Sequence, residues 1–221
     1  MAIHLLRDLE NLKKEILLLG AMVEEATHKA ILTVVDHRAE LADEVIAGDR
    51  EVDDNEVRVE EECLKVLALH QPVAFDLRFV LAVLKVNNDL ERVGDLARNI
   101  AKCALRLADH AEVSIPVRLR ALGDEVQRVL HRALDSFADG DAERAARVLE
   151  QDDQVDADQD VIIRAAIQEI TSHPELTSQG VDFILIAKNL ERVADHATNV
   201  AEDVILATQA RNVKHAAKLV R

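Results

Sequence analysis

Aromatic and turn-forming residues are scarce in this chain. Its 221 residues include four phenylalanines, no tryptophan and no tyrosine, with only three prolines and six glycines. Without aromatic side chains there is no platform on which nucleic acid bases could stack, and a net charge of -15 opposes binding to a phosphate backbone. We therefore expect no nucleic acid partner. The long stretches rich in Ala, Leu, Val, Glu and Arg are typical of a helical protein.

Cysteines and long apolar runs are also few. Cys63 and Cys103 lie within helical patterns, so we expect both to be reduced core residues. The longest uncharged apolar stretch near the N-terminus, Ile16 to Val23, is far too short to cross a bilayer. The first residues are charged and amphipathic, unlike a signal peptide. We expect a cytoplasmic protein that is not embedded in a membrane.

Sparse breaks divide the chain into six predicted helices. No segment alternates with a period of two, so no strand is expected. The breaks are predicted at Gly48-Asp49, His70-Gln71-Pro72, the segment before Pro116, Asp139-Gly140-Asp141 and Ser172-His173-Pro174. The helices between them should span about 3–47, 50–70, 73–110, 116–138, 141–172 and 176–210. Asp49 would then stand where it can cap the second helix.

An internal repeat indicates how these helices are organised. The stretch L-E-R-V-G-D-L-A-R-N-I at 90–100 returns as L-E-R-V-A-D-H-A-T-N-V at 190–200. Such a repeat predicts two copies of one structural unit. Each copy holds three predicted helices joined by short turns, which should pack as antiparallel neighbours. The sequence therefore predicts an all-α protein of two tandem, similar three-helix bundles, residues 1–110 and 111–221.

Each copy of the repeated motif carries a column of oxygen ligands. Residues four positions apart lie above one another on a helix, here on the side away from the apolar stripe. The columns are Glu91, Asp95 and Asn99 in the first half, and Glu191, Asp195 and Asn199 in the second. The preceding helices add Asp49 with Asp53, and Asp152 with Asp156. Side-by-side packing would give a first acidic patch (Asp49, Asp53, Glu91, Asp95) and a second acidic patch (Asp152, Asp156, Glu191, Asp195), each with an asparagine at its end.

These patches have two interpretations. Charged helix faces are usually solvated, and acids near a helix start also serve the cap and the macrodipole. Repetition favours a cation site, because like charges at this spacing destabilise a helix, and because Asp152 and Asp156 are predicted well inside theirs. Carboxylate clusters without cysteine suit Mg²⁺, Ca²⁺ or Mn²⁺, and iron or zinc where a histidine contributes. His196 is a candidate for that histidine, although a lone histidine is more often a surface residue.

The tandem motif with its acidic pairs resembles the PhoU family of phosphate-signalling proteins. The segment Q-P-V-A-F-D-L-R at 71–78 is also similar to that family, and the resemblance covers essentially the whole chain. It implies a non-catalytic cytosolic regulator, which negatively regulates the phosphate ABC transporter and silences the phosphate-sensing histidine kinase when phosphate is abundant. It also implies metal clusters on both acidic patches. We expect iron, zinc or manganese ahead of magnesium or calcium, and a homodimer.

Two alternatives stay open. A di-iron oxidase of the ferritin type needs two E-x-x-H elements in a four-helix core, whereas this chain has one, from Glu25 to His28. A helical scaffold or adaptor in which metal binding is incidental would differ in its metal content after purification without chelator. The segment Asp76-Leu77-Arg78 has no copy in the second half, which makes Arg78 a candidate for an asymmetric partner surface.

Overall fold

The computed structural model describes residues 2–108, 116–150 and 152–210, and their regular structure is helical throughout. The elements are α1 (Ala2–Val35), α2 (Glu40–His70), α3 (Ala74–Ala108), α4 (Val117–Asp139), α5 (Ala142–Leu149), α6 (Asp152–Ser172), the 3-10 turn η1 (Pro174–Leu176) and α7 (Thr177–Gln209). Within this described part of the chain, no helix is both long enough and apolar enough to cross a bilayer.

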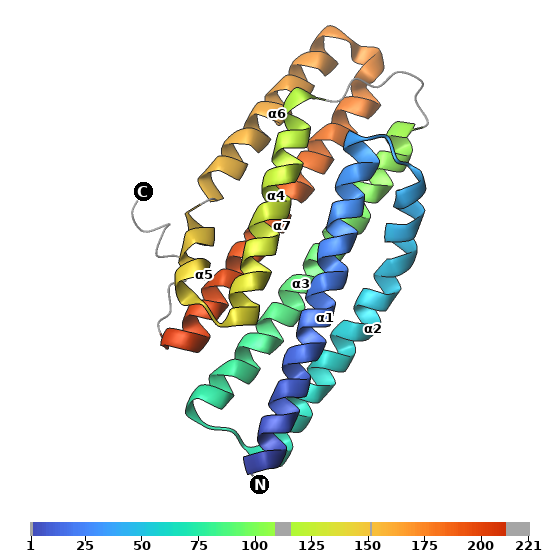
Figure 1. Ribbon diagram of the computed structural model, residues 1–221. Helices are drawn as coiled ribbons and strands as arrows, with labels where there is room; N and C mark the ends of the chain where they lie inside the picture. The colour runs from blue at the N-terminus through green and yellow to red at the C-terminus, as the bar shows by residue number, and fades with distance from the viewer. Residues whose placement is uncertain (1, 109–115, 151, 211–221) are drawn as a thin grey trace.

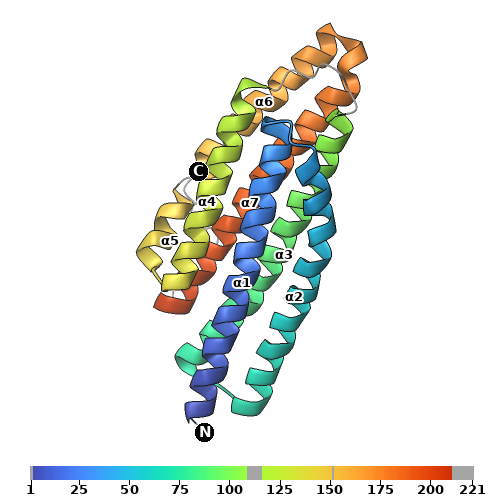
Figure 2. The same ribbon diagram turned by 45° about the vertical axis from the view of Figure 1, so that its right-hand side comes forward.

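The helices form two bundles that lie side by side (Figures 1 and 2). Helices α1, α2 and α3 pack together, and α7 packs against α4, α5 and α6. The bundles join where α3 runs alongside α7 in the opposite direction, and where α1 meets α4. The prediction of an all-α protein with two tandem three-helix bundles is confirmed, with α5 and α6 together forming the middle helix of the second bundle.

The core follows the apolar stripes of α3 and α7. The stripe residues are Val86, Leu90, Val93, Ala97, Ile100 and Ala104 on α3, and Ile186, Leu190, Val193, Ala197, Val200 and Val204 on α7, and all are buried. Because the repeated motif supplies the middle of both stripes, the same residues that define the repeat also form part of the core. Burial of these side chains is the main favourable term in folding.

The predicted helix over 3–47 is wrong. Helix α1 ends at Val35 and α2 begins at Glu40, so that Gly48 and Asp49 lie inside α2 and Asp49 caps nothing. The chain turns instead in the segment 36–39. Arg120 of α4 donates a hydrogen bond to the carbonyl oxygen of Val35 at 2.9 Å. This contact satisfies one of the carbonyls that a helix leaves without a partner at its C-terminus.

The turn after α1 lacks the glycine that commonly follows the end of a helix. His37 has a φ of 53°, in the left-handed region. Gly140, which lies 103 positions later, has a φ of 64° and ends α4. The two turns are therefore equivalent. A glycine adopts this conformation at no steric cost and signals a helix end, whereas a histidine at the same position gives no such signal.

The predicted helix over 141–172 is also interrupted. Asp141 caps α5, accepting hydrogen bonds from the backbone N–H groups of Glu143 at 2.9 Å and Arg144 at 3.0 Å. Helix α5 ends at Leu149, and Asp152 is the first residue of α6. The expectation that Asp152 lies well inside a helix is therefore wrong. Its position at the first residue of α6 is one where an acid can also interact with the helix macrodipole.

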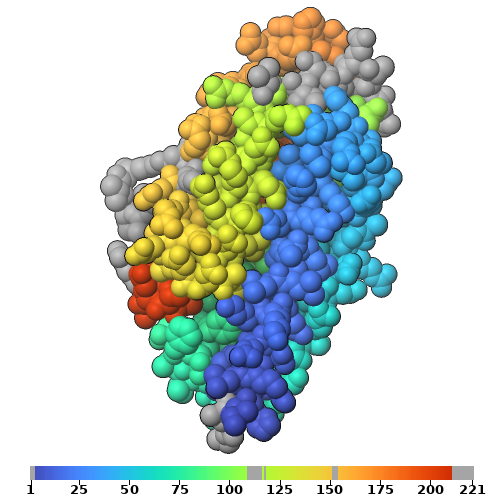
Figure 3. Space-filling view, viewed as in Figure 1, coloured from blue at the N-terminus to red at the C-terminus, as the bar shows by residue number. Residues whose placement is uncertain are grey.

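Close contact between α1 and α4 depends on two glycines. A Cβ atom on Gly123 would stand 2.8 Å from Cγ2 of Ile31, and one on Gly20 would stand 3.0 Å from Cδ2 of Leu134. Gly20 and Gly123 are 103 positions apart, as are Ile31 and Leu134, so the same contact is made twice. The space-filling view shows α1 and α4 meeting along one face of the molecule (Figure 3).

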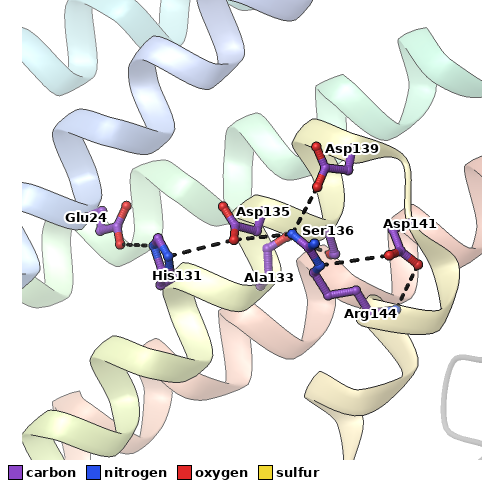
Figure 4. Close-up of polar contacts among 8 residues, drawn as sticks. All are labelled: Glu24, His131, Ala133, Asp135, Ser136, Asp139, Asp141 and Arg144. Atoms are coloured by element: carbon purple, nitrogen blue, oxygen red, sulfur yellow. Dashed lines mark hydrogen bonds and ion pairs between the residues drawn. The ribbon is translucent and has the colours of Figure 1, made fainter.

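A polar network on α1, α4 and α5 accompanies this contact (Figure 4). Nδ1 of His131 lies 2.7 Å from Oε1 of Glu24, and its Nε2 lies 3.7 Å from Asp135. Arg144 pairs with Asp135 at 3.3 Å and with Asp139 at 2.9 Å. His131, Asp135 and Asp139 are exposed, whereas Glu24 and Arg144 are half-buried. Each pair has at least one partner in solvent, so each contributes little stability. Their geometry nevertheless sets the start of α5 against α4.

Candidate functional site

The first acidic patch lies along the contact between α2 and α3. These helices pack against each other, with Asp49 and Asp53 on α2 and Glu91 and Asp95 on α3. The side chain of Asp49 is 10% exposed, and those of Glu91 and Asp95 are half-buried. The patch is therefore partly enclosed by the two helices, and only Asp53 is mainly exposed.

The four carboxylates act on one another electrostatically. Partial loss of solvent on the helix surface raises the pKa of Asp53, and the negative charges of Asp49 and Asp95 raise it further. Burial also raises the pKa of Glu91, where Arg92 opposes the effect and Asp95, Asp53 and Asp49 add to it. A carboxyl group whose pKa is raised by its neighbours is one that a cation would stabilise in its charged form.

Glu56 belongs to the same surface, and sequence reasoning missed it. Its pKa is raised first by burial, then by the charges of Glu60, Glu91 and Asp53. Asn87 of α3 donates a hydrogen bond to Oε1 of Glu56 at 3.2 Å. The acidic columns are defined by a spacing of four, whereas Glu56 lies three positions after Asp53, a spacing that also places it on the same helix face.

Arg98 occupies the space between the two helices. One of its terminal nitrogens pairs with Asp49 of α2, and the other donates to Oδ1 of Asp95 of α3 at 2.5 Å. In the repeat, the position 100 residues later holds Thr198, whose hydroxyl donates to the backbone carbonyl of Asp195 at 2.7 Å. The first half therefore contains an internal cation at a position where the second half has none.

The donor chemistry of the patch suits a hard or borderline cation, because its ligands are oxygens. Among the described residues, however, no three histidine, cysteine, aspartate or glutamate side chains are grouped so that they could hold one metal ion. Asp49 and Asp95 share a guanidinium group instead. A metal ion that used both of these residues would have to displace Arg98. Asn99 lies half-buried on α3, one turn beyond Asp95.

The second acidic patch is described in part. Glu191 is half-buried and Asp195 exposed on α7, and Asp156 is exposed on α6. Helices α6 and α7 pack against each other, as the prediction requires. The side chain of Asp152 lies outside the described residues, so the convergence of all four acids stays a prediction.

The two halves of the chain match one known domain. A sequence model of the PhoU domain matches residues 16–104 and again residues 119–204. The chain belongs to the PhoU family. It is 34% identical to the phosphate-specific transport system accessory protein PhoU homolog of Pseudomonas aeruginosa, over 94% of this chain and 86% of that protein. It is 32% identical to the phosphate-specific transport system accessory protein PhoU of Serratia marcescens, with the same coverage.

Solved structures of PhoU proteins have the same fold. The crystal structure of PhoU from Pseudomonas aeruginosa superposes with a TM-score of 0.90 at 33% identity, covering 93% of this chain and 99% of that one. The phosphate transport system regulatory protein PhoU from Streptococcus pneumoniae gives a TM-score of 0.88 at 28% identity, with coverage of 95% and 99%. Both PhoU repeats are therefore present in the arrangement that these structures share.

His196 and Asn199 join the two PhoU repeats. Nδ1 of His196 lies 2.7 Å from Oδ1 of Asp89 on α3, and the side-chain amide of Asn199 donates to the same oxygen at 3.2 Å. Asp89 is buried. Both residues, predicted as a candidate ligand and as the end of the second acidic patch, thus contact the other repeat. The histidine has no counterpart in the first half, where Leu96 stands.

Three basic side chains of α3 also contact α7. Nζ of Lys85 lies 2.7 Å from Asp203, and Nε of Arg106 donates to Asp182 at 3.0 Å. Both aspartates are buried. Arg78 donates to the carbonyl oxygen of Ala207 at 3.3 Å, near the end of α7. The residue that marked an asymmetric partner surface in the sequence therefore makes a contact between the two PhoU repeats.

Proposed function

We propose that this chain is a cytoplasmic regulator of phosphate uptake. In this proposal it restrains the phosphate ABC transporter, and it keeps the phosphate-sensing histidine kinase silent when phosphate is abundant. The observation that carries the proposal is the PhoU match in both halves, together with relatives named phosphate-specific transport system accessory proteins over 94% of the chain. We assign the chain a regulatory role and no catalytic one.

We also propose that the acidic patches bind divalent or trivalent metal ions, with iron, zinc or manganese ahead of magnesium or calcium. The support is a set of carboxylate oxygens on adjacent helices, where burial first and mutual repulsion second raise the pKa values of Asp53 and Glu91. A bound ion would supply the positive charge that offsets this repulsion, and it would stabilise the folded form by mass action. Asn99 and Asn199 are the neutral ligands that we propose at the ends of the patches.

The proposed working unit is a homodimer. One chain has a mass of 24.5 kDa, so light scattering after size-exclusion chromatography should give about twice that value at micromolar concentration. A mass equal to that of one chain would remove the dimer from the proposal and leave the regulatory role in place.

A helical scaffold or adaptor is the second candidate function, and Arg98 favours it. Because this side chain already neutralises Asp49 and Asp95, the first acidic patch has a structural role that needs no metal. In this case the bundles would bind their partners whether or not metal is present. The two candidates therefore differ in the metal content of the purified protein.

A deletion strain tests the regulatory role. The reporter is a gene that is normally switched on only in phosphate starvation, measured in phosphate-rich medium. We expect the deletion to leave the reporter on and the intact chain, supplied from a plasmid, to switch it off. An empty plasmid is the control. Normal repression in the deletion strain would show that this chain does not regulate the phosphate response.

A further inference from the structure

The two copies of the repeated motif differ at four positions, and one of these differences places an arginine beside the first acidic patch and a threonine beside the second. Position 98 holds an arginine and position 198 a threonine, whereas the two acids that precede them in the motif are the same in both copies. Arg98 can neutralise carboxylates on both helices, because its side chain is only 28% exposed and reaches from α3 to α2. It is therefore held by both helices that carry the first acidic patch.

A second arginine offers a comparison. Arg92 lies 3.3 Å from Glu91 and 3.6 Å from Asp95, but its side chain is 53% exposed and both contacts stay on α3. It is also repeated, as Arg192. Arg92 thus lies at the edge of the first patch and is common to both halves. Arg98 lies between the helices and occurs in one half only.

The guanidinium of Arg98 and a metal ion would use the same oxygens. Its hydrogen bonds to Asp49 and Asp95 are charge-assisted, and such bonds are about twice as strong as neutral ones. An incoming cation must break them, and must then hold an arginine side chain nearby as an unpaired positive charge. Both effects reduce the affinity of the patch for any other cation.

We propose that Arg98 is a built-in counter-ion that competes with metal ions for the first acidic patch, so that this patch binds cations more weakly than the second one. In the second repeat no such competitor stands at the corresponding position, because Thr198 is neutral and its hydroxyl bonds to the backbone of its own helix. This inference rests on the proposed cation binding, and it adds which patch binds cations more weakly and which residue weakens it.

The test is a calorimetric titration of the full chain with Mn²⁺ after the protein has been stripped with a chelator. Arg98→Thr copies the second repeat into the first, and it should add a binding site or tighten binding by roughly tenfold or more, as expected for the loss of two charge-assisted bonds. Arg92→Thr is the matched control, because it removes the same charge six residues earlier on the same helix. It should change the affinity by no more than about threefold, as a half-exposed charge is well screened.

Two further variants keep the test decisive. Adding Asp49→Asn and Asp95→Asn to Arg98→Thr should abolish the gained binding. The reciprocal change, Thr198→Arg, should weaken binding at the second patch of the otherwise unchanged chain. If Arg98→Thr fails to fold, Arg98→Lys replaces it, because a lysine ammonium is a single point charge and lacks the planar fork that lets a guanidinium contact two carboxylates through separate nitrogens. A partial gain in affinity is then expected.

The outcomes separate this inference from the proposed function. If the unchanged chain binds no Mn²⁺ but Arg98→Thr does, native metal binding is wrong and the role of Arg98 stands. If the unchanged chain binds Mn²⁺ and Arg98→Thr binds it no better than Arg92→Thr, Arg98 is an ordinary ion pair and the inference is overturned. It is equally overturned if neither the unchanged chain nor Arg98→Thr binds Mn²⁺.

Discussion

Replacing Gly123 by alanine should destabilise the protein, although alanine is the better helix former. The added Cβ would stand 2.8 Å from Cγ2 of Ile31, and within 3.6 and 3.7 Å of Cγ1 and Cδ1. Ile31 is buried, and a β-branched side chain in a helix has one strongly preferred rotamer. The clash between the added Cβ and Ile31 can therefore be removed only if α1 moves away from α4. Overpacking of this kind costs about 1–3 kcal/mol, against about 1 kcal/mol gained in helix propensity.

Gly48 provides the matched control. It lies inside α2, and a Cβ there would meet no atom within 4 Å. Gly48→Ala should therefore raise the free energy of unfolding by about 1 kcal/mol, and Gly123→Ala should lower it by up to about 2 kcal/mol. At about 2–4 °C per kcal/mol for a chain of this size, the two variants should melt several degrees apart.

The assay is thermal unfolding followed by circular dichroism. Gly20→Ala should fall between the other two variants, because its Cβ would meet a terminal methyl of Leu134 at 3.0 Å and that methyl can rotate away. The expected order of melting temperatures is Gly48→Ala, then Gly20→Ala, then Gly123→Ala. If Gly123→Ala melted as high as Gly48→Ala, the close contact between α1 and α4 would be wrong.

Three other predictions concern the core, the contact between the repeats and a helix cap. Burial raises the pKa of Cys63 to about 12 and raises that of Cys103 as well, so both thiols should resist a thiol reagent in the folded protein and react quickly in denaturant. Arg106→Ala leaves the buried carboxylate of Asp182 without this partner, so urea unfolding should show a loss of roughly 1–3 kcal/mol. Asp141→Ala should lower the melting temperature through loss of the α5 cap. The backbone N–H of Arg144, the largest cause, lowers the pKa of Asp141 below its ordinary 3.8, so its contribution is complete above that pH and fades below it. A melting-temperature difference that did not shrink in acid would contradict this account.

The sequence predicts the helices and their packing because the repeated motif carries the core. The apolar stripe from Leu90 and that from Leu190 are buried as their spacing requires. The turn after α1 escapes prediction because its left-handed residue is His37, where a glycine would have marked it. Gly48, by contrast, looked like a helix end and is an ordinary helical residue in α2.

The site is predictable only where spacing along one helix decides it. The neighbourhood of Asp49, Asp53, Glu91 and Asp95 follows from two acidic pairs on adjacent helices, and their mutual effect on pKa values agrees with it. The role of Arg98 depends on its reach from α3 to α2, which no pattern along the chain contains. The same is true of the contacts that His196 and Asn199 make with Asp89 on the other repeat.

The central claim is our proposal that the acidic patches of this PhoU-family chain bind metal ions. Its most direct test is the metal content of the chain purified without chelator. The double change Glu191→Gln with Asp195→Asn should remove at least half of the bound metal. Glu10→Gln with Glu61→Gln, which removes the same charge from exposed positions outside both patches, should leave the metal content unchanged. Full metal content in the first variant, or none in the unchanged chain, would contradict the account and favour a helical scaffold.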